Sequence, residues 1–197
     1  MTIFTIGHSN HELAGFVDLL GAHAITAIAD LRSSPASTRL PQFDQLALQA
    51  SLRERGVAYV FLGDALGGRP APTLLCPEGH ADYERMATQA CFSAGIDRLV
   101  RGGERYTLAL MCSEAEPSEC HRALLVGREL AIRGVDVLHI LRDGSTEAHT
   151  ALEGRLLAMA RLDHDDFFSP PQTRLADAYR RRAARVAWRP DREEAPT

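Results

Sequence analysis

Short apolar runs alternate with longer segments of helical periodicity along this chain. The runs have the length and near-continuous apolar character of strands covered on both faces, and they lie at 3–6, 25–31, 57–62, 106–111 and 136–141. Apolar residues at helical spacing predict helices near 13–20, at 44–55, and at about 81–101, 119–133 and 147–162. This alternation predicts an α/β fold, a three-layer sandwich with a mostly parallel central sheet of about five strands flanked by helices.

The chain changes character after residue 162. We expect residues 1–162 to form a single α/β domain, followed by a C-terminal extension, 163–197, with an arginine-rich helix and a polar tail. The arginines of this helix suggest a nucleic-acid surface. A solvated helix face that packs through Leu175, Tyr179 and Val186 is the simpler explanation, so nucleic acid is the weaker candidate partner.

Composition narrows the class of protein further. Hydrophobic residues make up 45% and charged residues 24% of the 197 residues, as in an ordinary globular domain. The formal net charge of -4 gives no overall attraction to nucleic acid or to an anionic membrane. No apolar run reaches the roughly 18–20 residues of a membrane span, and the N-terminus lacks a signal-peptide pattern. We therefore expect a cytoplasmic protein with no membrane partner, whose four cysteines are thiols.

The strongest candidate site lies in the segment 108–122. An apolar strand ends just before Cys112, so Cys112 and Glu114 are expected at the carboxyl edge of the sheet. Ser118 is a good N-cap, and the first turn of the helix that it would begin favours anions and ionised thiols. That first turn would hold Cys120, His121 and Arg122.

Three explanations fit this segment. In the first, a cysteine is the nucleophile, His121 or Glu114 moves protons, and Arg122 holds an anionic substrate. In the second, Cys112, Cys120 and His121 ligate a metal such as zinc, but their spacing fits no standard zinc pattern, and we assign no metal ligand. In the third, Cys112 is a small buried residue and Arg122 pairs with a nearby glutamate. Under the first explanation the catalytic residues are Glu114, His121, Cys112 and Cys120.

Two other strand ends carry polar residues that would meet at the same sheet edge. His8 and Ser9 follow the first strand, although a helix cap is the favoured explanation for Ser9 alone. Arg32 ends the second strand, where it would bind an anion or pair with Asp30, and Arg39 lies in the long loop that follows. The candidate substrate-binding residues are therefore His8, Ser9, Arg32, Arg39 and Arg122.

Four motifs in fixed order resemble those of a known family. They are Thr5–Asn10, Asp30–Pro35, Tyr59–Leu62 with the glycine pair at 67–68, and Cys112–Glu114 with Cys120–Arg122. Their order and spacing resemble the bacterial proteins called domain of unknown function 488, with a leucine at Leu31 as a mild departure. The resemblance implies a three-layer α/β fold and a shared pocket built from these motifs, and it favours functional roles for the site residues. It implies no particular reaction.

Several familiar chemistries are excluded by the residues after Cys112. The segment 113–118 contains two carboxylates and neither glycine nor arginine, so it forms neither a rhodanese-type nor a Cys-x5-Arg phosphatase loop. The chain also has no Walker loop and no dinucleotide fingerprint. Our leading hypothesis is an enzyme acting on a small or nucleotide-like anionic substrate in an anion-binding His/Glu/Cys/Arg pocket. A non-catalytic ligand-sensing or nucleic-acid-associated module and a metal-dependent Cys/His site are the alternatives; cofactor and oligomeric state stay unassigned.

Overall fold

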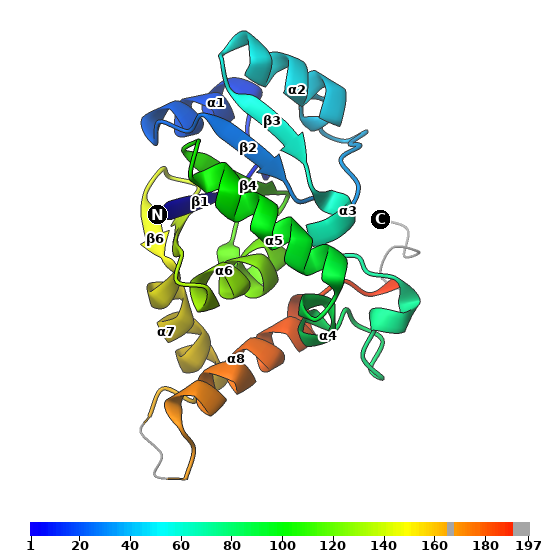
Figure 1. Cartoon of the computed structure of the whole chain (residues 1–197), viewed down its shortest axis with the longest axis vertical. Coiled ribbons are helices and arrows are strands. Elements are labelled where there is room, and N and C mark those ends of the chain that lie inside the picture. The colour runs from blue at the N-terminus through cyan, green and yellow to red at the C-terminus, as the bar shows by residue number, and fades with distance from the viewer. Residues whose placement is uncertain (165–167, 191–197) are drawn as a thin grey trace.

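The computed structural model describes residues 1–164 and 168–190, so the expected polar tail lies outside the described residues. The predicted α/β fold is confirmed: a sheet with strand order β3-β2-β4-β1-β5-β6 is flanked by helices (Figure 1). The strands are β1 (Thr2–Gly7), β2 (Ala27–Asp30), β3 (Ala58–Phe61), β4 (Leu108–Cys112), β5 (Asp136–Ile140) and β6 (Thr146–Ala148). Neighbours among β1 to β5 are parallel. The short β6, which the apolar pattern did not predict, pairs antiparallel with β5.

Helices cover both faces of the sheet and create a core on each side. On one face α1 (Leu13–Ala22) and α2 (Gln45–Glu54) bury Phe16 and Leu48 against Ile28 and Met111. On the other face the core contains side chains such as Phe92 and Ile96. The helices of that side are α3 (Gly63–Leu66), α4 (Tyr83–Ala87), α5 (Ala90–Gly103), α6 (Arg128–Ile132), α7 (His149–Ala160) and α8 (Pro171–Val186). None of the described helices is long and apolar enough to cross a bilayer.

Two predicted helices differ from the structure. The helix expected at 81–101 is divided into α4, which Asp82 caps by accepting from the amide of Arg85, and α5. The helix expected at 119–133 is replaced by a 3-10 turn (Pro117–Glu119), a π-helix (Arg122–Gly127) and α6. Ser118 is not an N-cap but lies inside the turn, which Glu116, two residues earlier, caps by accepting from the Ser118 amide. Cys120 consequently has an extended backbone rather than a place in a helical turn.

The C-terminal helix α8 packs on the face that carries α7. Tyr179 is buried there, and Leu175 and Val186 pack against the same core, which confirms the packing face predicted for this helix. Beyond the helix, the carbonyl of Trp188 accepts a hydrogen bond from the Ala81 amide. The end of the described chain thus reaches the region of α4.

Candidate functional site

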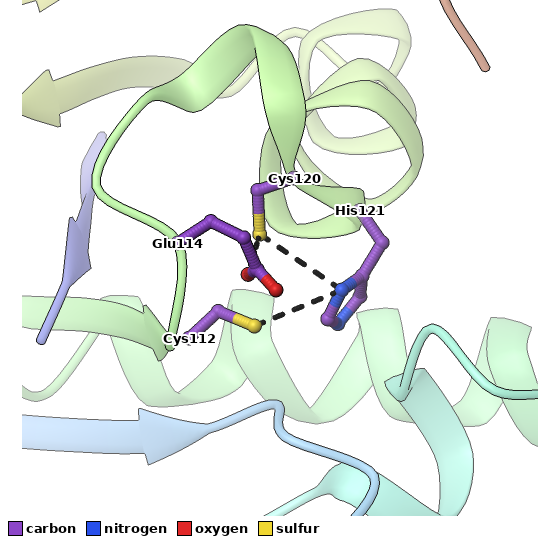
Figure 2. Close-up of side chains that lie close together, drawn as sticks. All are labelled: Cys112, Glu114, Cys120 and His121. Atoms are coloured by element: carbon purple, nitrogen blue, oxygen red, sulfur yellow. Dashed lines mark hydrogen bonds between the residues drawn. The ribbon is translucent and has the colours of Figure 1, made fainter. Parts of the chain in front are cut away.

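The carboxyl ends of β1, β2 and β4 lie side by side, because these strands are parallel neighbours. Gly7 at the end of β1 is in register with Cys112 at the end of β4. The chain then loops through the 3-10 turn back to the sheet edge. Four predicted residues converge there, with one donor atom of each within 4.8 Å of the others (Figure 2): Cys112, Glu114, Cys120 and His121. We call these four residues the sheet-edge cluster.

The ring of His121 is held so that one nitrogen faces both sulfurs. Its Nε2 lies 3.0 Å from the carbonyl oxygen of Leu31. A carbonyl only accepts, so Nε2 carries the proton and Nδ1 presents its lone pair. This Nδ1 is 3.7 Å from the Sγ of Cys112 and 3.9 Å from the Sγ of Cys120. The Cys120 thiol in turn donates to the carboxylate of Glu114 over 2.9 Å.

The loop that carries Glu114 is fixed from outside the cluster. A Cβ at Gly7 would lie 1.8 Å from the carbonyl oxygen of Glu114, so only glycine permits this close approach. The guanidinium of Arg122 donates to the carbonyls of Glu114 and Ala115. Backbone hydrogen bonds of 2.9 Å from the amides of residues 8 and 9 to the carbonyls of residues 112 and 113 complete the attachment. The sheet edge therefore determines the path of the loop.

Charges within the cluster shift the proton affinities of its members. Burial alone would raise the pKa of the Cys120 thiol, but the hydrogen bond from Cys112 and the positive charges of Arg122 and His121 outweigh it and hold the pKa well below the usual value. Burial and the nearby Cys120 and Glu114 raise the pKa of Cys112 well above its usual value. Burial opposes a charge on His121, yet Cys120 and Glu114 raise its pKa. Of the two thiols, Cys120 is therefore the more easily ionised.

Glu114 is exposed as a residue, although its carboxylate is largely enclosed by protein. Much of its surface faces the cavity and is accessible to solvent. Its carboxylate nevertheless lies against Cys120, and burial together with the negative charge of that sulfur raises the pKa of Glu114. A carboxyl group with raised pKa is suited to accept and return a proton near neutral pH.

A cavity of about 210 Å³ adjoins the cluster, and Cys112, Glu114 and His121 form part of its wall. Gly68 lies directly over the His121 ring: a Cβ there would be 2.7 Å from Nδ1. The glycine pair noted in the sequence therefore serves close packing against the imidazole. Across the cavity lie polar groups of the loops after β2 and β3, namely Ser33, Ser34 and Arg69.

Arg32 lines this cavity, but the protein itself occupies its hydrogen-bond donors. The guanidinium is buried and donates to both carboxylate oxygens of Asp30, with an ion-pair distance of 2.6 Å. A further bond of 2.7 Å goes to the carbonyl of Phe43. Tyr59 donates to the same Asp30 carboxylate over 2.7 Å. The Asp30 pairing considered from the sequence is thus what the structure contains.

The other predicted binding residues lie outside the cavity wall. Arg122 is completely buried and faces the loop carbonyls. His8 stacks on Phe43 with ring centroids 4.3 Å apart, and burial, with the charge of Arg32, lowers its pKa to about 4. Ser9 has a positive φ of 44°, its hydroxyl donates to Asn10, and it does not cap α1. Arg39 is exposed on the loop after β2.

Several arginines of α8 are engaged within the protein. Arg180 donates to the carboxylate of Glu84, and Arg182 donates to the carbonyl of Ser118 and to the carboxylate of Glu119. These bonds attach α8 to α4 and to the turn that precedes Cys120. They account for these arginines without a nucleic-acid partner.

Three hydrophobic wall residues were not predicted. Tyr83, Val186 and Trp188 line the cavity, although two of them lie more than sixty residues from the cluster in sequence. A possible signal was the single tryptophan of the chain, directly after an amphipathic helix. A large aromatic residue at such a position often packs against a neighbouring surface.

These features define the class of protein: a three-layer α/β domain with a cluster of thiols, imidazole and carboxylate beside a small cavity at the carboxyl edge of its sheet. A family model described as "Domain of unknown function DUF488" matches residues 12–128, more than half of the chain. The chain therefore belongs to this family, as its motifs predicted. The match includes the whole sheet-edge cluster. No curated protein and no solved structure gives a significant match.

Proposed function

We propose that this protein is a metal-dependent enzyme acting on a small substrate. Cys112, Cys120 and His121 would hold a zinc-type ion, and Glu114 would move protons beside it. The observation that carries this proposal is the convergence of four donor atoms within 4.8 Å at the wall of an open cavity.

The spacing of the donors suits a tetrahedral ion. With bonds of about 2.3 Å to sulfur and about 2.0–2.1 Å to nitrogen, such an ion separates a sulfur from a nitrogen ligand by roughly 3.6 Å. The two sulfur-to-nitrogen distances of the cluster are 3.7 and 3.9 Å. Two thiolates and a carboxylate in one small volume repel one another strongly, and a divalent cation would neutralise that charge.

The surroundings of the donors support the same conclusion. Metal-binding histidines usually donate their other ring N–H to a carbonyl or carboxylate, as His121 does to Leu31. The amide of Arg122 lies 3.4 Å from the Cys120 sulfur and donates to it, which stabilises a thiolate ligand. These contacts are made by the protein itself and orient the imidazole and the Cys120 sulfur toward one point.

The donor set points to hydrolysis as the reaction class. One imidazole, two thiolates and a nearby non-ligand glutamate form the arrangement by which zinc deaminases activate water. Here Glu114 would take a proton from the water molecule while the oxygen of that water bonds to an electrophilic carbon of the substrate. It would then return that proton to the leaving nitrogen or oxygen as that bond breaks.

The cavity limits the size of the substrate. Its volume of about 210 Å³ is below the roughly 300–1,000 Å³ of most ligand pockets. An anionic or nucleotide-like end would meet the polar wall residues Ser33, Ser34 and Arg69. Arg32 would act through Asp30 as a positioning residue, since its donors are already used.

Metal analysis tests the proposal first. Protein purified without chelator and without a metal-affinity step should contain a near-stoichiometric transition metal. Cys112→Ser and His121→Gln should each contain one equivalent less than the wild type, whereas the matched control Cys91→Ser, at an exposed thiol, should contain as much as the wild type. A metal-free wild type, or full metal content in both site variants, would refute the metal centre.

Glu114→Gln separates binding from catalysis. This variant should keep its metal and lose turnover in a screen of small amides, amidines and phosphorylated compounds. Equal turnover by wild type and Glu114→Gln would remove the glutamate from the reaction.

A metal-free thiol enzyme is the second candidate. It is favoured by the lone pair of His121 facing both sulfurs while its other nitrogen is anchored, the arrangement of an activated nucleophile and its base. After treatment with chelator, iodoacetamide should then label Cys120 at pH 6 faster in the wild type than in His121→Gln, while the exposed Cys91 reacts equally in both. Equal labelling of Cys120 in the two proteins would dismiss this candidate.

A further inference from the structure

A second group of metal-type donors lies in the loop before α4. The isolated bridge between Leu75 and Ala81 closes this loop. Within it the amide of Cys76 donates to the carbonyl of His80, and the amide of Gly79, at a φ of 78°, donates to the carbonyl of Cys76, both over 2.8 Å. This fold brings one donor atom of each of three side chains within 4.8 Å of the others: Cys76, Glu78 and His80.

One of these side chains is buried without a partner. His80 is only 7% exposed, and its Nδ1 has no hydrogen bond among the described residues. A buried polar atom left unpaired costs about 1–3 kcal/mol, so native proteins rarely retain one without a use. A bound cation would satisfy the imidazole at this place. Cys76 is half-buried and Glu78 exposed, so the loop is open to solvent on its other side.

We propose that Cys76, Glu78 and His80 form a second metal site, separate from the sheet-edge cluster. Thiolate, imidazole and carboxylate together suit zinc or cobalt better than the hard cations magnesium and calcium. Three protein ligands leave a fourth position for water.

Other groups around the loop are compatible with a cation. Asp82 and Glu84 line the same cavity of about 470 Å³ as the three ligands. Two guanidiniums near the loop donate to its backbone: that of Arg85 to the carbonyl of Leu75 over 3.3 Å, and that of Arg189 to the carbonyl of Glu78 over 2.6 Å. Arg189 therefore holds the loop by its backbone and leaves the Glu78 carboxylate available.

A metal here would stabilise one wall of the candidate active site. The amide of Ala81 donates to the carbonyl of Trp188 over 2.9 Å, and Trp188 lines the 210 Å³ cavity. The loop and the segment after α8 are thus held together at two points, the Ala81 amide and the Glu78 carbonyl. Binding at the loop would order this wall whether or not the sheet-edge cluster holds an ion.

Cobalt titration tests the site. In a Cys112→Ser/Cys120→Ser protein, which lacks the sheet-edge thiols, Co²⁺ should still produce a thiolate charge-transfer band at one equivalent. Adding Cys76→Ser should abolish the band, and adding His80→Gln should weaken Co²⁺ binding by more than about tenfold, since even outer-shell changes cost 10–100-fold. Adding Cys91→Ser should change neither. No band in the folded double variant, or a band that persists after Cys76→Ser, would overturn the proposal.

If the double variant does not fold, the second site can be tested by alkylation of Cys76 in protein that keeps Cys112 and Cys120. Zn²⁺ should slow alkylation of Cys76 in the wild type, as measured on its peptide by mass spectrometry, and should not protect Cys76 in His80→Gln. Cys91 should react equally with and without Zn²⁺. Equal reactivity of Cys76 in both conditions would overturn the second site and leave the sheet-edge proposal untouched.

Discussion

Replacing Arg122 with methionine tests how the sheet-edge loop is held. Arg122 is the largest fully buried side chain of the described residues. Its guanidinium donates to the carbonyls of Glu114 and Ala115, and its Nε lies 3.4 Å from the hydroxyl oxygen of Thr5. Methionine is unbranched and has no donor, and its side chain ends about where the Nε of arginine lies, so Arg122→Met keeps the apolar stem and leaves both carbonyls without their partner.

The expected loss of stability follows from these contacts. Each part-buried carbonyl that loses a charged donor costs about 1–3 kcal/mol. Removing a buried guanidinium also recovers part of its desolvation cost, which offsets some of that loss. We expect a net decrease of about 2–5 kcal/mol in the free energy of unfolding, a large share of the roughly 5–15 kcal/mol typical of a domain. Arg122→Lys keeps the charge and one carbonyl contact, so its loss should be about half as large.

Urea unfolding at constant m-value measures this difference. The midpoints should fall in the order wild type, Arg122→Lys, Arg122→Met. The control Arg39→Met alters an exposed arginine and should stay within about 0.5 kcal/mol of wild type. If Arg122→Met also stayed within about 0.5 kcal/mol, the loop would not depend on the guanidinium, and our account of the site would fail.

Three further predictions follow from single contacts. Gly68→Ala places a methyl group 2.7 Å from the Nδ1 of His121. The metal content measured by elemental analysis should therefore fall sharply, and urea unfolding should show a loss of about 1–3 kcal/mol in the free energy of unfolding. Unchanged metal content would contradict this prediction. Tyr179→Phe removes the hydroxyl between His149 and Glu153, so the free energy of unfolding measured in urea should fall by about 1–2 kcal/mol. An unchanged free energy of unfolding would show that these hydrogen bonds do not stabilise the fold. Burial lowers the pKa of His149 from 6.5 to about 4, so the unfolded state binds the proton first, and stability should fall by up to about 1.4 kcal/mol per pH unit as the pH drops through that interval. A smaller slope in His149→Gln would support this assignment, and an identical slope would not.

The sheet was predictable because its central strands are buried on both faces. Such strands must be nearly continuous apolar runs, and the runs ending near Asp30 and Cys112 mark the carboxyl edge directly. Parallel pairing then implies that residues after these strands meet. The three-residue strand β6 escaped prediction because Thr146 and Glu147 are polar and the strand lies at the sheet edge.

The directions of the charged side chains were not predictable. A sequence shows that Arg32 and Arg122 follow strand ends, but not that one turns back to Asp30 and the other to the carbonyls of residues 114 and 115. Those carbonyls become partners only once Gly7 has let the loop approach β1. Trp188 lines the cavity, and its backbone is held by a hydrogen bond from the Ala81 amide, a residue far away in the sequence. Local sequence patterns do not encode such a contact.

The sequence spacing of Cys112, Cys120 and His121 argued against a metal site because it fits no standard zinc pattern. The structure shows why that argument does not hold. Standard zinc patterns assume that consecutive ligands are joined by a tight turn or lie on one helix. Here Glu116 caps a 3-10 turn begun by Pro117, and that turn brings the extended Cys120 back over the end of β4. A gap of seven residues between two cysteines can therefore close on one point.

The scaffold of the cluster is separate from its chemistry. Gly7, the guanidinium of Arg122 and backbone hydrogen bonds to β1 determine the path of the loop, and the hydrogen bonds of that guanidinium to the loop carbonyls use neither a sulfur nor the His121 ring. Contacts of the protein chain alone therefore bring the donors together, so that folding offsets the cost of their convergence. For the same reason Cys112→Ser should lose metal or reactivity while the loop keeps its path, so that this variant tests the chemistry of the site and Arg122→Met tests its support.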